Sequence, residues 1–150
     1  MTSQKQITID SNLFEWPSED PKLFGSKCSD CKEVTFPAQA GCPKCSGASC
    51  EKIELSTKGT LWTWTTQGFR PKEPYRGNDT DDTFKPYYVG YVELPGQVRV
   101  ETRLEVDDAS QLKIGMEMEL IIVKFREDED GSEVMTFAFE PLKTGSQERI

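Results

Sequence analysis

Four of the five cysteines form two pairs, Cys28-x2-Cys31 and Cys42-x2-Cys45, with ten residues between the pairs. A spacing of two residues lets both sulfurs of a tight turn reach one tetrahedral metal ion, about 2.3 Å away. Because all four candidate ligands are sulfurs, no coordination position is left for water, and the pattern predicts a structural site. We therefore predict one structural Zn²⁺ per chain, held by Cys28, Cys31, Cys42 and Cys45.

The same cysteines admit other interpretations. Two disulfide bonds would require an oxidising compartment, and an iron site of the rubredoxin type uses the same tetrahedral set of sulfurs. The gap of ten residues between the pairs is short for a rubredoxin proper. Cys50 is left over, and without an imidazole to activate it we interpret it as a small tolerated residue rather than a reactive thiol.

The sequence contains no histidine. This excludes mechanisms that need imidazole, such as Ser-His-Asp triads, Cys-His dyads and histidine-ligated catalytic zinc. Carboxylates, lysine or tyrosine could still catalyse a reaction, but no pair of acidic residues stands apart from the charged strand faces. We therefore expect a protein that is not an enzyme by itself.

The net charge of −8 argues against sequence-independent binding to the nucleic acid backbone, because such binding relies on Lys and Arg replacing counterions. The charge is uneven: residues 1–100 carry 12 basic against 13 acidic residues, and residues 101–150 carry 6 against 13. No apolar run reaches the roughly 18 residues of a membrane span. Residues 1–10 lack the pattern of a signal peptide, so we expect a cytoplasmic protein with no membrane partner.

We expect a mainly β fold in three parts. In residues 1–27, aromatic and aliphatic residues interrupted by Pro17 and Pro21 predict a short N-terminal helical segment. Residues 28–50 are predicted to form a rubredoxin-like zinc ribbon, with a short strand at 34–37 between its cysteine pairs. Residues 51–150 are predicted to form a five-stranded OB-fold barrel. A hydrophobic content of only 35% favours two small cores over one large one.

Beyond residue 50 the hydrophobic pattern has a period of two, which is typical of half-buried strands. The clearest example is residues 97–106, where Val98, Val100, Thr102 and Leu104 alternate with charged residues. Five antiparallel strands in about 80 residues, with no long helix, favour a small barrel of the OB type. The predicted strands are residues 59–67, 87–94, 97–106, 118–125 and 133–139.

Residues 68–86 form a long segment rich in Pro, Gly and Asp, in which basic residues alternate with aromatic ones. A segment of this length in a compact domain is usually either functional or a solvated loop. Its composition suits a phosphate-bearing ligand with a ring that can stack, although three aspartates dilute its positive charge. Both interpretations stay open at this point.

A different class of function, the binding of single-stranded nucleic acid, is the alternative for an OB-fold barrel. Trp62, Trp64, Tyr88 and Tyr91 could stack on bases, but aromatic residues that alternate along a strand more often belong to the core. The acidity of the chain makes nucleic acid the less favoured partner.

The chain resembles the acyl-CoA-associated zinc-ribbon/OB-fold family, long catalogued as a domain of unknown function. The resemblance covers about residues 12–142, and the ribbon cysteines are its most specific part. Two departures stand out: Ala38-Gln39 occupies a place that is often arginine in the family, and Lys32 follows Cys31 where glycine is common. The matching residues are Trp16, the two cysteine pairs, Val34-Thr35-Phe36-Pro37, Gly59-Thr60-Leu61-Trp62, Pro86-Tyr87, Val92-Glu93-Leu94 and Leu112-x2-Gly115-Met116.

The resemblance implies an accessory subunit of a thiolase-type enzyme, such as the small subunit of benzoylsuccinyl-CoA thiolase, rather than a catalytic chain. It implies a hetero-oligomer with a thiolase-fold catalytic subunit, in which this chain helps to shape the site for coenzyme A or acyl-CoA. On that view Arg70, Lys72 and Arg76 would face the phosphates, and Phe69, Tyr75 and Tyr87 would offer apolar or stacking surface. The alternative for each of these residues is an ordinary surface or barrel position.

Overall fold

The computed structural model describes residues 5–68, 70–72, 77–80 and 83–142, and strands dominate this part of the chain. The mainly β fold predicted from the sequence is confirmed. No helix in the described residues is both long enough and apolar enough to cross a membrane. The elements are β1 (Gln6–Thr8), β2 (Phe24–Cys28), β3 (Val34–Thr35), β4 (Cys50–Glu54), β5 (Lys58–Gln67), β6 (Tyr87–Glu93), β7 (Arg99–Leu104), the 3-10 turn η1 (Ala109–Gln111), β8 (Glu117–Glu127) and β9 (Glu133–Pro141).

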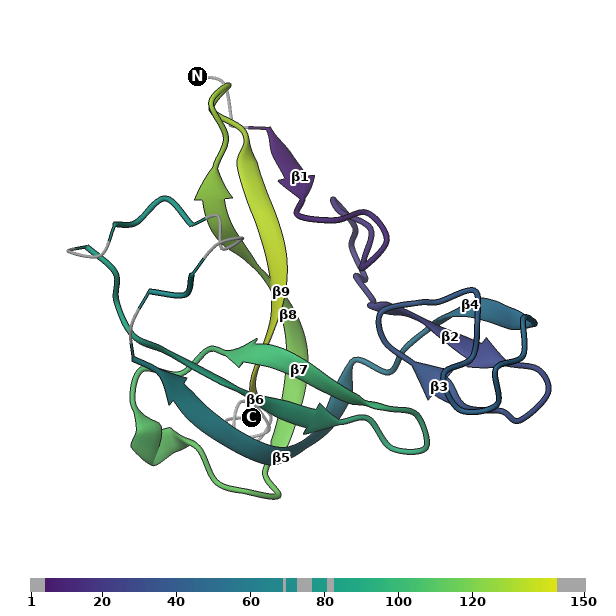
Figure 1. Cartoon of the computed structure of the whole chain (residues 1–150). Coiled ribbons are helices and arrows are strands. Elements are labelled where there is room, and N and C mark those ends of the chain that lie inside the picture. The colour runs from purple at the N-terminus through teal and green to yellow at the C-terminus, as the bar shows by residue number, and fades with distance from the viewer. Residues whose placement is uncertain (1–4, 69, 73–76, 81–82, 143–150) are drawn as a thin grey trace.

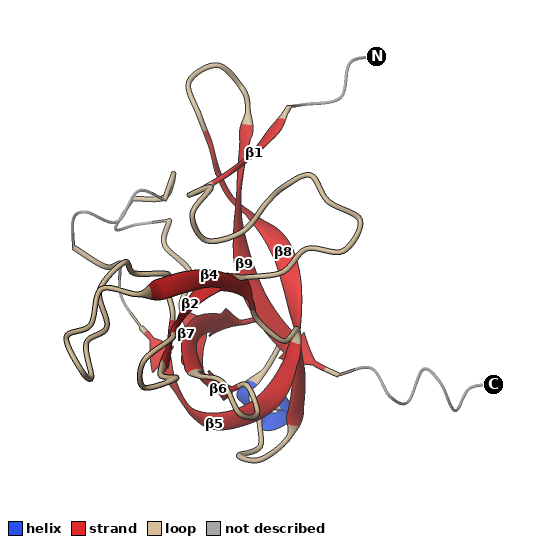
Figure 2. Ribbon diagram, turned by 90° about the vertical axis from the view of Figure 1, so that its right-hand side faces the viewer, coloured by secondary structure: helices blue, strands red, loops and turns tan. Residues whose placement is uncertain are grey.

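Five of these strands close into a barrel, in the order β5-β6-β7-β9-β8 and back to β5. Figure 2 shows the strands curving around a central axis. Closure follows because β8 pairs with β5 through one part of its length and with β9 along most of it. The five-stranded barrel expected from the alternating pattern is therefore confirmed, and full closure leaves few unpaired strand edges.

One pairing differs from the expected antiparallel barrel. Strands β7 and β9 run parallel, and their register joins Arg103 to Ala138 and Leu104 to Phe139. The cause is the connection through η1, which carries the chain from β7 across the barrel so that β8 pairs with β5. The next hairpin then returns β9 alongside β7 in the same direction.

The cysteine-rich part forms a separate three-stranded antiparallel sheet in the order β3-β2-β4. Figure 1 shows this ribbon to the right of the barrel, joined to it by the short link between β4 and β5. Phe36, at the end of β3, points back to the barrel and meets Phe137 of β9 edge to face, with ring centroids 5.6 Å apart.

The predicted N-terminal helical segment is wrong, because residues 5–27 contain no helix. Strand β1 instead pairs in parallel with β9, and Phe14 forms an isolated antiparallel bridge with Leu23. Pro17 and Pro21 explain the difference, since a proline removes a helical N–H donor and holds the preceding residue in an extended conformation.

The apolar core is one continuous cluster, not the two small cores that the low hydrophobic content suggested. Phe14 and Leu23 from the N-terminal segment and Leu55 from the link join the barrel residues, and all three are fully buried. The chain extends its barrel core toward the ribbon with these side chains, which explains how a sequence of modest apolar content supports both parts.

Candidate metal centre

The two cysteine pairs fold into two turns of the same shape. In the first, Cys28 ends β2, its N–H donates to the carbonyl of Glu33, and the N–H of Lys32 donates back to the carbonyl of Cys28 at 2.8 Å. In the second, the N–H of Cys42 donates to the carbonyl of Gly47, and the N–H of Ser46 donates to the carbonyl of Cys42 at 2.9 Å. Each turn therefore presents its two sulfurs on one side.

The four sulfurs face one another at distances that suit a metal ion. All four Sγ atoms lie within 4.8 Å of one another, with Cys28 and Cys45 at 3.6 Å and Cys31 and Cys42 at 3.5 Å. A tetrahedron with sulfur–metal distances of 2.3 Å has edges of about 3.8 Å, so the cluster fits Zn²⁺ with little adjustment. Four protein sulfurs would fill the coordination sphere of such an ion, as in a structural centre.

Backbone N–H groups prepare the sulfurs to bind a cation. The N–H of Cys31 is the main cause that lowers the pKa of Cys28 to about 7, and the N–H of Cys45 is the main cause that lowers the pKa of Cys42. The N–H of Gly47 acts in the same direction on Cys45, but the neighbouring sulfurs raise the pKa of that thiol to about 12. Without a metal ion, four neighbouring thiols cannot all ionise, because their thiolates would repel one another. A bound divalent cation offsets this repulsion.

Cys50 lies beside this centre without belonging to it. It is the direct antiparallel partner of Cys28 in the pairing of β4 with β2, and its side chain is half-buried. Burial, followed by the nearby sulfurs, raises the pKa of its thiol. A neutral thiol is a poor nucleophile, which favours the interpretation of Cys50 as a small tolerated residue rather than a reactive thiol.

Of the six residues that the resemblance assigns to a coenzyme A site, Arg70, Lys72 and Tyr87 belong to the part of the chain that the structure describes. Phe69, Tyr75 and Arg76 lie outside the described residues. The Nε of Arg70 donates to the carboxylate of Asp79 at 3.0 Å, whereas Lys72 is exposed.

Tyr87 lies at the start of β6, where the guanidinium of Arg103 stacks on its ring at 4.3 Å. The ring of Phe84 meets it edge to face, with centroids 5.8 Å apart. Burial is the main cause that raises the pKa of the Tyr87 hydroxyl, so this group stays protonated at neutral pH. The guanidinium of Arg103 therefore already covers one face of the Tyr87 ring.

Asn78 is a positioning residue that sequence reasoning did not single out. Its amide accepts a hydrogen bond from the N–H of Glu127 at 2.7 Å and donates to the carbonyl of Glu127 at 3.2 Å. These two hydrogen bonds hold the described part of segment 68–86 against the end of β8. An Asn-Asp dipeptide in a Gly-rich stretch was the available signal, but it indicates a turn and not a distant partner.

The four aromatic residues considered for base stacking divide into two pairs. Trp64 and Tyr88 are half-buried, pack against the core and meet edge to face at 6.0 Å. Trp62 and Tyr91 are exposed and meet edge to face at 6.1 Å on the outer face of the barrel. The expectation that alternating aromatics belong to the core is thus correct for one pair only.

Comparison with known proteins identifies both parts of the chain. Residues 19–51 match the ChsH2 rubredoxin-like zinc ribbon domain, and residues 52–123 match the ChsH2 C-terminal OB-fold domain. A solved structure, the Ltp2-ChsH2(DUF35) aldolase, superposes with a TM-score of 0.57 at 23% identity, covering 80% of this chain and 84% of that chain. At this level of identity the likeness shows the fold alone.

Two relatives extend the similarity over most of the chain. Benzoylsuccinyl-CoA thiolase subunit BbsA of Thauera aromatica is 29% identical over 133 residues, which is 87% of this chain and 85% of the relative. A DUF35 domain-containing scaffold protein of Methanothermobacter thermautotrophicus is 34% identical over 124 residues, which is 79% of this chain and 86% of the relative. With both domains matched in order, the chain belongs to the ChsH2/DUF35 family of zinc-ribbon and OB-fold proteins.

Proposed function

We propose that this protein is a cytoplasmic, non-catalytic accessory subunit of a thiolase-type acyl-CoA enzyme. The observation that carries the proposal is its similarity, over 87% of its length, to a protein named as a benzoylsuccinyl-CoA thiolase subunit. Relatives named as scaffold proteins support a role in assembly. The catalytic groups belong to a thiolase-fold partner, with which this chain forms a hetero-oligomer.

The chemistry of the metal centre supports the non-catalytic part of this role. Cys28, Cys31, Cys42 and Cys45 would hold one Zn²⁺ with no position left for water or substrate. The ion would supply a rigid cross-link between the two turns of the ribbon, while the chain offers no histidine for acid–base catalysis.

The finer part of the proposal is that segment 68–86 helps to shape the site for coenzyme A. The hydrogen bonds between Asn78 and Glu127 support it, because they hold the segment at one end of the barrel. Lys72 is exposed and able to meet a phosphate, and Arg70 would exchange the carboxylate of Asp79 for one. Arg76 would add a third cation, while Phe69, Tyr75 and Tyr87 would line the ring of the nucleotide.

The assembly is tested by co-expressing the tagged chain with each thiolase-fold protein encoded in the source genome, followed by gentle purification and native mass spectrometry. We expect one of these proteins to form a defined hetero-oligomer that has thiolase activity toward an acyl-CoA. If none of them binds, or if the isolated chain turns over an acyl-CoA by itself, the proposal is wrong.

The coenzyme A contact is tested in that complex with the double variant Arg70→Ala/Arg76→Ala. We expect weaker coenzyme A binding by at least about tenfold, because each charge-assisted bond contributes roughly 1.5–3 kcal/mol. The double variant Lys27→Ala/Lys58→Ala removes the same charge from exposed positions on β2 and at the start of β5, and is the matched control. Equal affinity in both variants would remove segment 68–86 from the site.

A further inference from the structure

Large apolar side chains are exposed at four described positions: Ile9, Trp62, Tyr91 and Ile114. Two of them are neighbours on adjacent strands, and a third lies in a segment beside β5. Trp62 on β5 is 46% exposed and Tyr91 on the adjacent β6 is 39% exposed. Ile114, 63% exposed, lies in the segment that follows η1, and this segment runs beside β5 because Gly115 donates to the carbonyl of Leu61 at 2.7 Å. Apolar groups collected on one face mark an interaction surface more often than scattered ones do.

A β-bulge places Trp62 and Trp64 on opposite faces of β5. Along a regular strand Trp62 and Trp64 would point to the same face, because side chains alternate with a period of two. In β5 the register with β6 shifts between Leu61 and Thr63, so Trp62 is the extra residue of the strand. Leu61 is buried, so Trp62 faces solvent by ordinary alternation, and the extra residue turns Trp64 instead of Thr63 toward the core.

The exposed Trp62 is held in place by its neighbours. The guanidinium of Arg99 on β7 stacks on its ring at 4.0 Å, and the ring of Tyr91 meets it edge to face at 6.1 Å. Arg99 is itself fixed by Glu93, whose carboxylate lies 3.5 Å from its Nε. Trp, Tyr and Arg dominate the energetics of protein interfaces, and an ordered set loses little conformational entropy when a partner binds.

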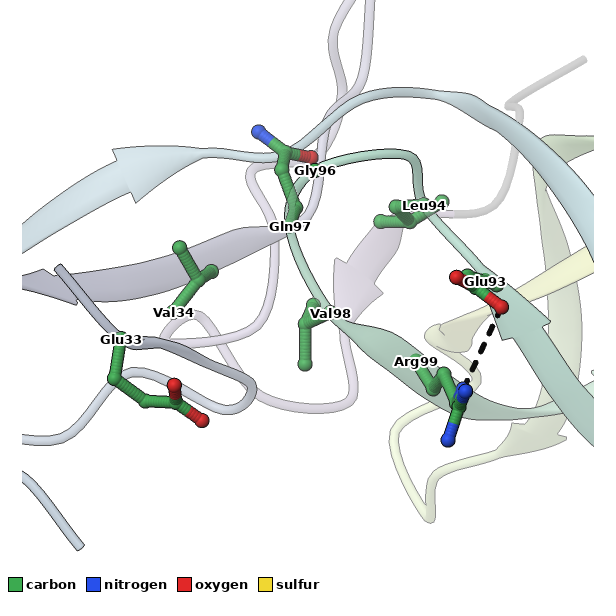
Figure 3. A pocket seen from close by; sticks show the side chains of 8 residues that line it. All are labelled: Glu33, Val34, Glu93, Leu94, Gly96, Gln97, Val98 and Arg99. Atoms are coloured by element: carbon green, nitrogen blue, oxygen red, sulfur yellow. Dashed lines mark ion pairs between the residues drawn. The ribbon is translucent and has the colours of Figure 1, made fainter. Parts of the chain in front are cut away.

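A groove of about 470 Å³ continues this face toward the ribbon. Figure 3 shows Glu33 and Val34 of the ribbon on one side, and Val98 and Arg99 of the β6–β7 hairpin on the other. The groove shares Glu93 and Arg99 with the surroundings of Trp62. The hairpin is fixed relative to the link before β5, because the side chain of Gln97 accepts a hydrogen bond from the N–H of Ser56 at 2.8 Å.

The charges around this surface specify its partner. Glu33 and Glu93 line the groove, and Glu101 is exposed opposite Tyr91 in the β6–β7 register. The ammonium of Lys44 lies 3.9 Å from the carboxylate of Glu33, so the three acids outnumber the two nearby cations by one. Arg99 is the one cation among the residues that line the groove, and it is already engaged with Trp62 and Glu93. A protein segment with an apolar side chain and a Lys or Arg fits this end of the surface, whereas the phosphates of a nucleic acid would be repelled.

We propose that Trp62, Tyr91, Arg99 and Ile114, together with the acidic groove between ribbon and hairpin, form the docking surface for the catalytic partner subunit. This inference rests on the proposed function for the existence of that partner. It adds the location: the partner inserts a basic and apolar segment into the groove and covers Trp62. The metal centre contributes indirectly to this surface, because it fixes the part of the ribbon in which Glu33 and Val34 line the groove.

The test measures the dissociation constant of the purified chain for the thiolase-fold subunit that co-assembles with it. We expect the double variant Trp62→Ala/Tyr91→Ala to weaken binding by at least about 30-fold, the effect of losing an interface hot spot. The matched control is Ile9→Ala, which removes the fourth exposed apolar side chain and leaves affinity within about threefold. Circular dichroism should show that both variants fold, since all three side chains are exposed.

The outcomes separate this inference from the proposed function. If a thiolase-fold subunit binds the wild type and the Trp62→Ala/Tyr91→Ala variant equally well, the docking surface is wrong and the accessory role stands. If no thiolase-fold subunit binds the wild type, both are wrong. Two further results would overturn the inference, because the face would then belong to another occupant. One is self-association of the chain through Trp62, measured by sedimentation of the chain alone. The other is quenching of the fluorescence of Trp62 by an oligonucleotide.

A second variant tests the charge of the groove. We expect Glu33→Lys/Glu101→Lys to slow association with the partner by at least about tenfold at low salt, because like charges then meet across the interface. Raising the salt concentration should narrow the difference from the wild type. Identical association rates at low salt would exclude a basic partner segment at this end of the surface.

Discussion

Lys32 and Ser46 occupy equivalent positions in the two turns of the metal centre. Each follows the second cysteine of its pair, and each donates its N–H to the carbonyl of the first cysteine, at 2.8 and 2.9 Å. Both have positive backbone φ, 69° for Lys32 and 64° for Ser46. This left-handed conformation is natural for glycine and costly for other residues.

We predict that Lys32→Gly stabilises the zinc-loaded chain by about 1 kcal/mol, because the left-handed conformation then carries no steric cost. Ser46→Gly should act in the same direction. The measurement is the midpoint of urea unfolding at constant slope.

Lys32→Ala is the control for this substitution. It also removes the bond from the Lys32 ammonium to the carbonyl of Ser29, but it keeps a Cβ at the strained position. We expect no stabilisation from Lys32→Ala. A gain equal to that of Lys32→Gly would show that the lysine side chain, and not the backbone conformation, is unfavourable.

The second prediction concerns metal content. The purified chain should contain one zinc ion, and Cys45→Ser should lose it together with much of the ribbon structure, because metal binding supplies folding free energy in such sites. Cys50→Ser should retain the full zinc content, because Cys50 lies outside the four-sulfur cluster. Elemental analysis of the two variants decides the point, and loss of zinc from Cys50→Ser would place Cys50 among the ligands.

The third prediction concerns pH. The pKa of Cys28 is lowered from 9.0 to about 7 in the folded chain, so its thiolate stabilises the fold at high pH and loses that contribution as the pH falls through about 7. Zinc binding must therefore displace more protons below this pH than above it. Titration calorimetry in buffers of different ionisation enthalpy should show proton release decreasing as the pH rises through 7. A constant release would contradict the lowered pKa.

The sequence predicted the barrel strands from alternating hydrophobic and polar residues, which are clearest from Val98 to Val106. It could not predict which strands become neighbours, since alternation indicates a buried face and not a partner, and the parallel β7–β9 pair was therefore missed. The helical segment failed for a local reason: apolar spacing favoured helical turns, but Pro17 and Pro21 prevented them.

The metal centre was predictable because cysteine spacing alone limits where four sulfurs can meet, and the structure brings Cys28, Cys31, Cys42 and Cys45 together as predicted. That Trp62 and Trp64 face opposite sides of β5 was not predictable. A bulge is one added residue in one strand, and it leaves no mark on the hydrophobic pattern until the partner strand is known. The same limit hid Asn78, whose hydrogen-bonding partner lies 49 residues away in sequence.

The last prediction concerns Gly90, which lies on β6 and pairs with Trp64 of β5. A Cβ at this position would lie 2.2 Å from the carbonyl oxygen of Thr63 and 3.0 Å from a methyl group of Leu104. The carbonyl belongs to the backbone of the neighbouring strand, so the clash is relieved only if the sheet moves beside the bulge at Trp62. We expect Gly90→Ala to lower the free energy of unfolding by about 1–3 kcal/mol, as for other overpacked cores.

Gly96→Ala provides a comparison for Gly90→Ala. Gly96 has a φ of 72° in the turn between β6 and β7, and no atom lies within 4 Å of an added Cβ. Its cost is therefore conformational alone, about 1 kcal/mol. Gly90→Ala should therefore lower the free energy of unfolding more than Gly96→Ala does. Equal effects of the two variants on stability would refute the close contact between Gly90 and Thr63.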